Sequence, residues 1–327
     1  MSFQIDTQTL NDLSVFGTGR TKTVYEIFNR VKTHGGTKLL EEMFRYPLSD
    51  MKAIQKRVDT IRYYGVNQMK FPFQPSLFDA VEFYLDNTDS RSQLMAQDNT
   101  LERRIKSWIV SDSEYSWIHA GIVGCLELLN TLDDFLKQVK DEADENVVEL
   151  NATLETLLHN EKWNWFSSEK GKKKISFERA VEYDKVLRFE ENDRIHKILY
   201  QIYQMDVYTS VAQVANECGF SYPKVCPTEQ NILNMKGVFH PFLAKPVSNT
   251  LSVNKDSNVI FLTGANMAGK STFMKSISIA VYLAHMGFPV PAEELEFSVY
   301  EGMFTTINLP DNLNMGYSHF YSEVLRL

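Results

Sequence analysis

The chain has 327 residues, 43% of them hydrophobic and 12% aromatic, which is enough for about two globular domains and excludes a disordered polymer. Its net charge of -8 excludes a uniformly basic nucleic-acid-binding surface, although it leaves room for a local basic face. The three cysteines lack metal-ligand spacing, and no apolar run reaches the about 18 residues of a membrane span, so we expect a soluble, cytoplasmic protein with reduced thiols and no membrane partner.

The first part of the chain is predicted to be helical. Apolar residues recur at helical spacing through residues 24–64, and this pattern predicts several short helices in succession. Between them, Gly35-Gly36 is expected to form a turn, and Ser49 or Asp50 is expected to cap the next helix. Pro75 marks a break before a further helical stretch.

The middle of the chain is rich in leucine at three- and four-residue spacing. Residues 118–158 are therefore predicted to be helical, with a solvated acidic segment at residues 141–145. The longest periodic stretch covers residues 177–217 and stops at Gly219. Read as one helix, it would extend about 50 to 60 Å and connect distant parts of the molecule; read otherwise, it is two helices joined near Asn192-Asp193.

Prolines and β-favouring residues become frequent after Cys218, and this change predicts a domain boundary near residue 222. Downstream we expect a strand at Val259 to Leu262, a helix from Lys270 to His285 and a strand at Met303 to Ile307. The predicted fold is therefore multi-domain. Residues 1–221 form an all-α helical domain, and residues 222–327 form part of an α/β P-loop domain with a parallel sheet.

A glycine-rich loop lies between this predicted strand and helix. Gly264 and Gly269 allow the backbone to turn its amides inward, and the helix that follows directs its positive amino end at the same point. Lys270 is expected to reach the β and γ phosphates of a nucleotide, and the Ser271 hydroxyl to contact magnesium. The alternative is an ordinary glycine turn. The candidate nucleotide-binding residues are Gly264, Ala265, Asn266, Met267, Ala268, Gly269, Lys270, Ser271 and Thr272.

The segments around this loop resemble the MutS family of DNA mismatch-repair ATPases. Thr263 to Met274 is similar to the family's phosphate loop, and Gly287 to Ala292 to the turn after its helix. Gly316 to Glu323 is similar to its signature loop. The resemblance extends to the start of the family's helical core and lever domain at Arg20 to Arg57, and to the end of its lever helix at Met205 to Ala215.

Family membership implies an ABC-type ATPase that binds ATP and Mg²⁺ as a dimer, here expected to be a homodimer through the ATPase domain. The signature loop of each subunit, Gly316 and Ser318 in this chain, would complete the other subunit's site. Ser318 has the alternative role of a helix N-cap. Asn249 is expected either to lie near the nucleotide base or to cap a turn.

Duplex DNA, including branched or mismatched forms, is the partner that the resemblance implies. Direct mismatch reading is not expected, because no counterpart of the family's mismatch-reading domain precedes the helical part. Lys172, Lys173 and Lys174, together with Trp163, Trp165 and Phe166, form a basic and aromatic cluster that could contact a DNA backbone; the alternative is a solvated loop.

The chain stops at Leu327, before the acidic strand with which the family positions the attacking water. The catalytic residues are therefore unknown, and we expect a fragment in which hydrolysis is uncertain. The resulting hypothesis is an ATP-binding component of DNA mismatch repair or recombination that relays nucleotide state through a long helix to levers near DNA. A scaffold or dimerisation protein with the same fold is the alternative, and a small-molecule kinase has less support because no arginine-rich lid follows the loop.

Overall fold

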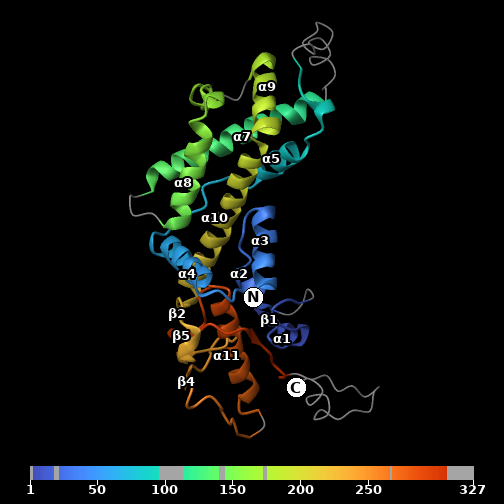
Figure 1. Cartoon of the computed structure of the whole chain (residues 1–327). Coiled ribbons are helices and arrows are strands. Elements are labelled where there is room, and N and C mark those ends of the chain that lie inside the picture. Colours follow the sequence, from blue (N-terminus) through green and yellow to red (C-terminus); the bar gives the residue numbers. More distant parts are fainter. Residues whose placement is uncertain are drawn as a thin grey trace, which may run out of the picture. The chain divides into compact units, whose positions relative to one another are not determined.

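A computed structural model describes residues 3–17, 22–95, 113–139, 144–171, 175–265 and 267–307 (Figure 1). In chain order, the first half contains β1 (Gln4–Ile5), α1 (Thr7–Asp12), α2 (Val24–Phe28), α3 (His34–Arg45), α4 (Met51–Val66), α5 (Ser76–Asp86), the 3-10 turn η1 (Ser90–Ser92), α7 (Ser113–Gln138) and α8 (Glu145–Leu158). The second half contains η3 (Glu161–Trp163), η4 (Phe166–Glu169), α9 (Phe177–Asp184), the π-helix η5 (Lys185–Glu190), α10 (Asn192–Cys218), β2 (Lys224–Cys226), η6 (Thr228–Gln230), β3 (Leu233–Val238), β4 (Asn249–Val253), α11 (Lys270–His285), β5 (Glu294–Ser298) and β6 (Gly302–Met303).

The chain divides by its contacts into two compact units. Unit 1 comprises residues 1–31, 37–69 and 207–327, and unit 2 comprises residues 32–36 and 70–206. This division does not follow a single boundary near residue 222, because the first helices belong with the C-terminal part. The assignment of 1–221 and 222–327 to two family domains stays a prediction.

Unit 1 contains a four-stranded sheet in the order β2-β5-β3-β4. Only β2 and β5 are parallel, whereas β3 is antiparallel to both β5 and β4. The expectation of a parallel sheet is therefore wrong for the described residues, where the sheet is mixed. The short β1 pairs in parallel with β6. Because β1 lies within residues 1–221, this part of the chain is not purely helical.

Aromatic side chains from distant segments form the core of unit 1. The ring of Phe288 lies 5.4 Å from that of Phe28 and 5.8 Å from that of Phe44, and Tyr282 on α11 lies 6.3 Å from Phe44. All four side chains are buried. Such pairs add to the burial of apolar area, so they fix α11 against α2 and α3.

Unit 2 is a helical unit in which α5 packs on α7 and α9 continues into η5 (Figure 1). A buried ion pair lies in this unit, with Arg188 Nη2 donating to Asp184 Oδ2 at 2.7 Å. Arg188 also donates to the carbonyl oxygens of Asn87 and Ser92, and the Tyr84 hydroxyl donates to Asp184 at 2.9 Å. This network connects η5 to the segment that follows α5.

Several predicted boundaries are confirmed. Asp50 caps α4 by accepting a hydrogen bond from Ala53 N at 2.8 Å. Pro75 precedes α5, and α11 ends at His285 as predicted. Gly219 follows α10 with a φ of 64°. Each of these signals acts on the helix end next to it, and for this reason the sequence alone predicts it.

The predicted turn at Gly35-Gly36 is wrong, because both residues lie inside α3. Thr33 caps this helix, since its hydroxyl accepts from Gly36 N at 3.0 Å. Thr33 N and Thr33 Oγ1 each donate to the buried Asp206 at 2.8 Å. Glycine is required at position 35 for another reason, because a Cβ there would meet the Tyr203 ring at 2.4 Å.

The single helix over residues 177–217 is also wrong, and the alternative of two helices is confirmed. The α-helical geometry gives way to the π-helix η5 after Asp184, and α10 begins at Asn192. Helix α10 alone has 27 residues, about 40 Å. The π-helix coincides with the buried Arg188 network, which apolar periodicity does not reveal.

Candidate functional site

The predicted phosphate loop leads directly into α11. Gly269 occupies the N-cap position with a φ of 90°, a left-handed conformation that favours glycine. A Cβ at this position would meet nothing within 4 Å, so the space in front of the helix is open. Phe273 N donates to Gly269 O at 2.9 Å, which starts the helical hydrogen bonding immediately after the loop.

Lys270 folds back across the loop. Its Nζ donates to Gly264 O at 2.6 Å and to Ala265 O at 2.8 Å. Two carbonyl oxygens thus hold the ammonium group beside the amino end of a 16-residue helix. Phosphate oxygens are stronger hydrogen-bond acceptors for an ammonium group than carbonyl oxygens are. The Lys270 ammonium group could therefore exchange its two carbonyl partners for the oxygens of an anion bound at the amino end of α11.

The rest of the loop is open to solvent. Gly264, Ala265, Ala268, Ser271 and Thr272 are exposed. Met267 has a φ of 65° and a fully exposed side chain. Asn266 lies outside the described residues. The Ser271 hydroxyl is thus accessible on the first turn of α11, as magnesium contact requires.

The predicted strand before the loop is not formed. Val259 to Leu262 has no regular structure, and Val259 and Phe261 are 86% and 89% exposed. A strand needs neighbours for its backbone hydrogen bonds, and none of the strands in the described ranges pairs with this segment. A continuous apolar run is typical of a strand that is buried on both faces. Here neither face of the run is covered, because no neighbouring strand in the described residues pairs with it. The predicted strand at Met303 to Ile307 is likewise reduced to β6, Gly302–Met303.

Asn249 begins β4 and donates through Nδ2 to Val247 O at 3.1 Å. This bond is local, and both expected roles of Asn249 stay predictions. Upstream, Phe242 N donates to His240 Nδ1 at 3.4 Å, and burial, with a smaller contribution from Lys275, lowers the pKa of His240. Pro241 and Phe242 line a pocket of about 620 Å³.

The opposite end of α11 is buried and tightly held. Arg57 Nη1 on α4 donates to Met286 O at 2.9 Å, and the Tyr282 hydroxyl donates to Phe44 O. His285 Nδ1 lies 2.9 Å from Leu48 O, while its Nε2 accepts from Tyr300 N at 3.3 Å. The helix that begins in the exposed loop therefore ends on α3, α4 and the segment between them. Sequence analysis did not reveal these contacts, because no local pattern marks them.

The aromatic members of the expected DNA-contacting cluster pack against one another and against Tyr183. Trp163 and Phe166 are buried, and the half-buried Trp165 stacks on Tyr183 with ring centroids 3.8 Å apart. These rings form a small core, so Trp163 and Phe166 do not face a nucleic acid, while DNA contact by the lysines stays a prediction. The nearby Lys170 pairs with Asp134. Lys172, Lys173 and Lys174 lie outside the described residues, as do Gly316 and Ser318.

The described residues offer neither a cluster of metal-binding side chains nor a membrane-spanning helix. In the ranges that the structure describes, no group of three or more His, Cys, Asp or Glu side chains could hold a metal ion. None of the helices in those ranges combines the length and apolar character that a membrane crossing demands.

Family models and individual proteins that match this chain all belong to the MutS family. Residues 8–212 match the model of MutS domain III, and residues 260–327 match that of MutS domain V. The chain is 24% identical to the DNA mismatch repair protein MutS of Petrotoga mobilis over 416 aligned positions, which cover 99% of this chain and 50% of the relative. Since this alignment is longer than 327 residues, the relative carries additional residues between the matched segments.

Two further MutS proteins match shorter stretches. The Clostridioides difficile protein is 31% identical over 58% of this chain, which is 20% of its own length. The Leuconostoc mesenteroides protein is 35% identical over 40% of this chain, which is 16% of its own length. The chain thus spans about half the length of the Petrotoga relative and less of the others. Because the match to domain III alone covers more than half of its residues, the chain belongs to the MutS family.

Proposed function

We propose that this chain is an ATP-binding part of a DNA mismatch-repair protein, in which α11 relays nucleotide state to the helices that it contacts in unit 1. The observation that carries the proposal is the position of Lys270 Nζ, held by two loop carbonyls at the amino end of α11. The relatives are named DNA mismatch repair proteins, and this name supports DNA as the partner of the whole protein.

Binding would use groups that the loop already presents. Lys270 would exchange Gly264 O and Ala265 O for phosphate oxygens, and the exposed loop amides would donate to the same anion. The Ser271 hydroxyl would hold the Mg²⁺ that neutralises the phosphates. Apart from its chain neighbours, a Cβ built at Gly269 would meet no atom within 4 Å, so side chains from other parts of the described chain leave this point accessible to an anion.

The relay would follow from the two ends of α11. Its first turn is largely exposed, whereas Ile279 to Met286 is buried against the helices of unit 1. A shift of the loop around a triphosphate would therefore act on Phe44, Leu48 and Arg57, which contact the buried end. This route differs from the long continuous helix that was expected.

Lys270→Ala tests the binding site. Removing the ammonium group should weaken the affinity for Mg²⁺–ATP at least tenfold, with the fold retained, because Lys270 is not buried. Titration with a fluorescent ATP analogue measures this change, and Lys275→Ala on the same helix is the matched control. Equal affinities of Lys270→Ala and the unsubstituted chain would refute the assignment.

A scaffold function is the second candidate, and one observation favours it. The exposed apolar segment Val259 to Leu262 is a surface of the kind that associates with another chain. Self-association that Phe261→Ser abolishes, together with no response to Mg²⁺–ATP, would favour the scaffold over the nucleotide-binding function.

A further inference from the structure

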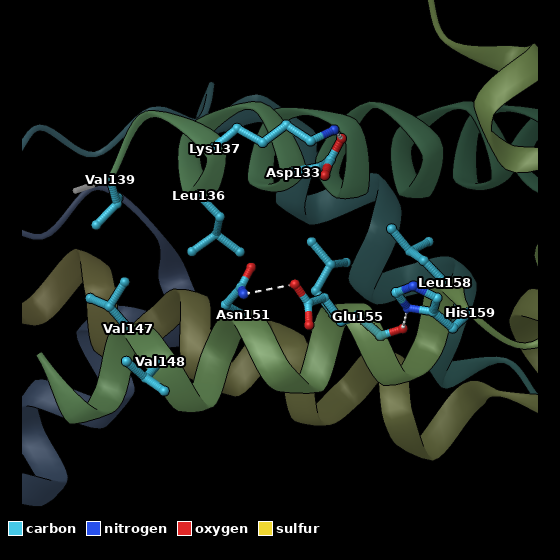
Figure 2. A pocket seen from close by; sticks show the side chains of 11 residues that line it. Asp133, Leu136, Lys137, Val139, Val147, Val148, Asn151, Glu155, Leu158 and His159 are labelled. Carbon is cyan, nitrogen blue, oxygen red and sulfur yellow. Dashed lines mark hydrogen bonds and ion pairs between the residues drawn. The ribbon is translucent and has the colours of Figure 1, made fainter. Parts of the chain in front are cut away.

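A groove of about 560 Å³ lies in unit 2 between the last turns of α7 and the length of α8 (Figure 2). Leu136 and Val139 line it from the α7 side, and Val147 and Leu154 from α8. Figure 2 shows the Leu136 side chain directed toward α8. Val148, at 54% exposure, adds an accessible apolar side chain to the edge of the groove.

Acidic side chains outnumber basic ones on the two helices that form this groove. The ranges Ser113–Gln138 and Glu145–Leu158 contain seven Asp or Glu residues and a single lysine, Lys137; of these, Asp133, Glu155 and Lys137 line the groove. Lys137 is already paired with Asp133 at 2.5 Å. Two lysines from other segments approach these helices, Lys170 at Asp134 and Lys197 at 3.9 Å from Glu149, and an excess of negative charge remains.

Glu155 lines the groove itself. Its Oε1 accepts from the Asn151 amide at 3.0 Å (Figure 2), and within the described residues no lysine or arginine forms an ion pair with its carboxylate. His159, one turn further, lies with Nδ1 2.8 Å from Glu155 O. The edge of the groove thus presents a solvated carboxylate beside apolar side chains.

We propose that this groove, formed by α7 and α8, is a docking site for a basic amphipathic helix of a partner protein. The apolar side chains would receive the apolar face of that helix, and the surrounding carboxylates would attract its cationic edges. Helix α8 has 14 residues, about 21 Å, which matches three to four turns of a docked helix. The negative charge opposes a phosphate backbone, so the groove favours a protein segment over DNA.

The test uses the full chain and a fluorescein-labelled probe peptide that repeats Leu-Lys-Lys-Leu-Leu-Lys-Leu twice. A second peptide with glutamate in place of each lysine has the same apolar face and the opposite charge. Fluorescence anisotropy should show binding of the lysine peptide at least tenfold tighter than that of the glutamate peptide. Equal affinities would overturn the proposal, since the acidic edges would then have no effect.

Variants locate the binding. Glu155→Lys and Val148→Lys change exposed groove residues, and each should weaken the affinity for the lysine peptide at least fivefold. Glu127→Lys makes the same charge reversal at an exposed α7 position that does not line the groove, and should change the affinity less than twofold. An equal effect of Glu127→Lys would show non-specific charge attraction and overturn the proposal.

Two other occupants are excluded by further measurements. Sedimentation of the chain alone should give the same mass for the unsubstituted protein and Val148→Lys; a dimer lost in Val148→Lys would assign the groove to a second copy instead. Labelled duplex DNA, tested without the peptide, should bind the unsubstituted chain and the groove variant Val148→Ser equally, and a weaker affinity of Val148→Ser would assign the surface to nucleic acid.

Discussion

At the residue scale, His285 connects the end of α11 to two neighbouring segments. Its ring is buried among Phe3, Phe297 and Tyr300. With Tyr300 N donating to Nε2, the proton resides on Nδ1 and is donated to Leu48 O, so the ring is neutral. Burial lowers the pKa of His285 to about 4, against a smaller opposing effect of the Leu48 carbonyl.

This shift predicts a pH dependence of stability. The unfolded chain binds a proton at His285 near pH 6.5, whereas the folded chain does so only near pH 4. The stabilisation is therefore complete above pH 6.5 and is lost as the pH falls toward 4. Between pH 7.5 and 5, this one group should lower the free energy of unfolding by about 2 kcal/mol.

Urea unfolding of His285→Gln measures this contribution, because glutamine removes the titration while keeping a donor and an acceptor. The difference in unfolding free energy between pH 7.5 and 5 should be smaller in His285→Gln than in the unsubstituted chain. His159→Gln, at an exposed histidine, is the control. Identical pH dependences in all three proteins would contradict the buried neutral ring.

The segment from Gly264 into α11 shows what residue-level prediction can achieve. Gly269, Lys270 and the helix end at His285 were predictable, because a glycine-lysine pair and a helical period are local features. The anchoring contacts of Arg57 and Tyr282 were not, since their partners lie 229 and 238 residues away in sequence.

At the scale of elements, the π-helix η5 interrupts what periodicity alone reads as one long helix. Apolar spacing continues through residues 177–217, so the pattern gives no sign of the break. The polar network around Arg188 accounts for it. Arg188 Nη1 and Nη2 together donate to Asn87, Ser92 and Asp184, and both side chains of the ion pair are fully buried.

Removing Arg188 should therefore destabilise unit 2 strongly. Arg188→Met would leave the Asp184 carboxylate buried and without its cation, although the Tyr84 hydroxyl and Leu94 N would still donate to it, at a cost of about 3 to 5 kcal/mol. Chemical denaturation followed by circular dichroism measures the loss. Arg194→Met removes a 50% exposed arginine from its pair with Glu191 and should cost less than about 1 kcal/mol. Equal losses would show that burial of the pair has no special effect.

The elements also show why one strand prediction failed. Val259 to Leu262 has the composition of a buried strand, but whether such a segment becomes a strand depends on neighbours elsewhere in a sheet. In the described residues it stays irregular and exposed. Helices satisfy their own backbone, and for this reason α4, α5 and α11 were easier to predict than the strands.

At the scale of the whole molecule, the family assignment and the predominantly helical character agree with what the sequence indicated. The mixed sheet and the division into interleaved units were not predictable, because both arise from contacts between residues far apart in the chain. The proposed function requires that a nucleotide bound at residues 264–272 changes the contacts at the buried end of α11.

Hydrogen–deuterium exchange of the full chain, with and without Mg²⁺–ATP, tests this claim most directly. Exchange should slow at residues 264–272, where backbone amides would bind phosphate, and should change at residues 282–288 and 44–57, where α11 contacts α3 and α4. Lys270→Ala should abolish both effects. Unchanged exchange at residues 264–272 at saturating Mg²⁺–ATP would contradict the binding site, and protection confined to those residues would contradict the relay.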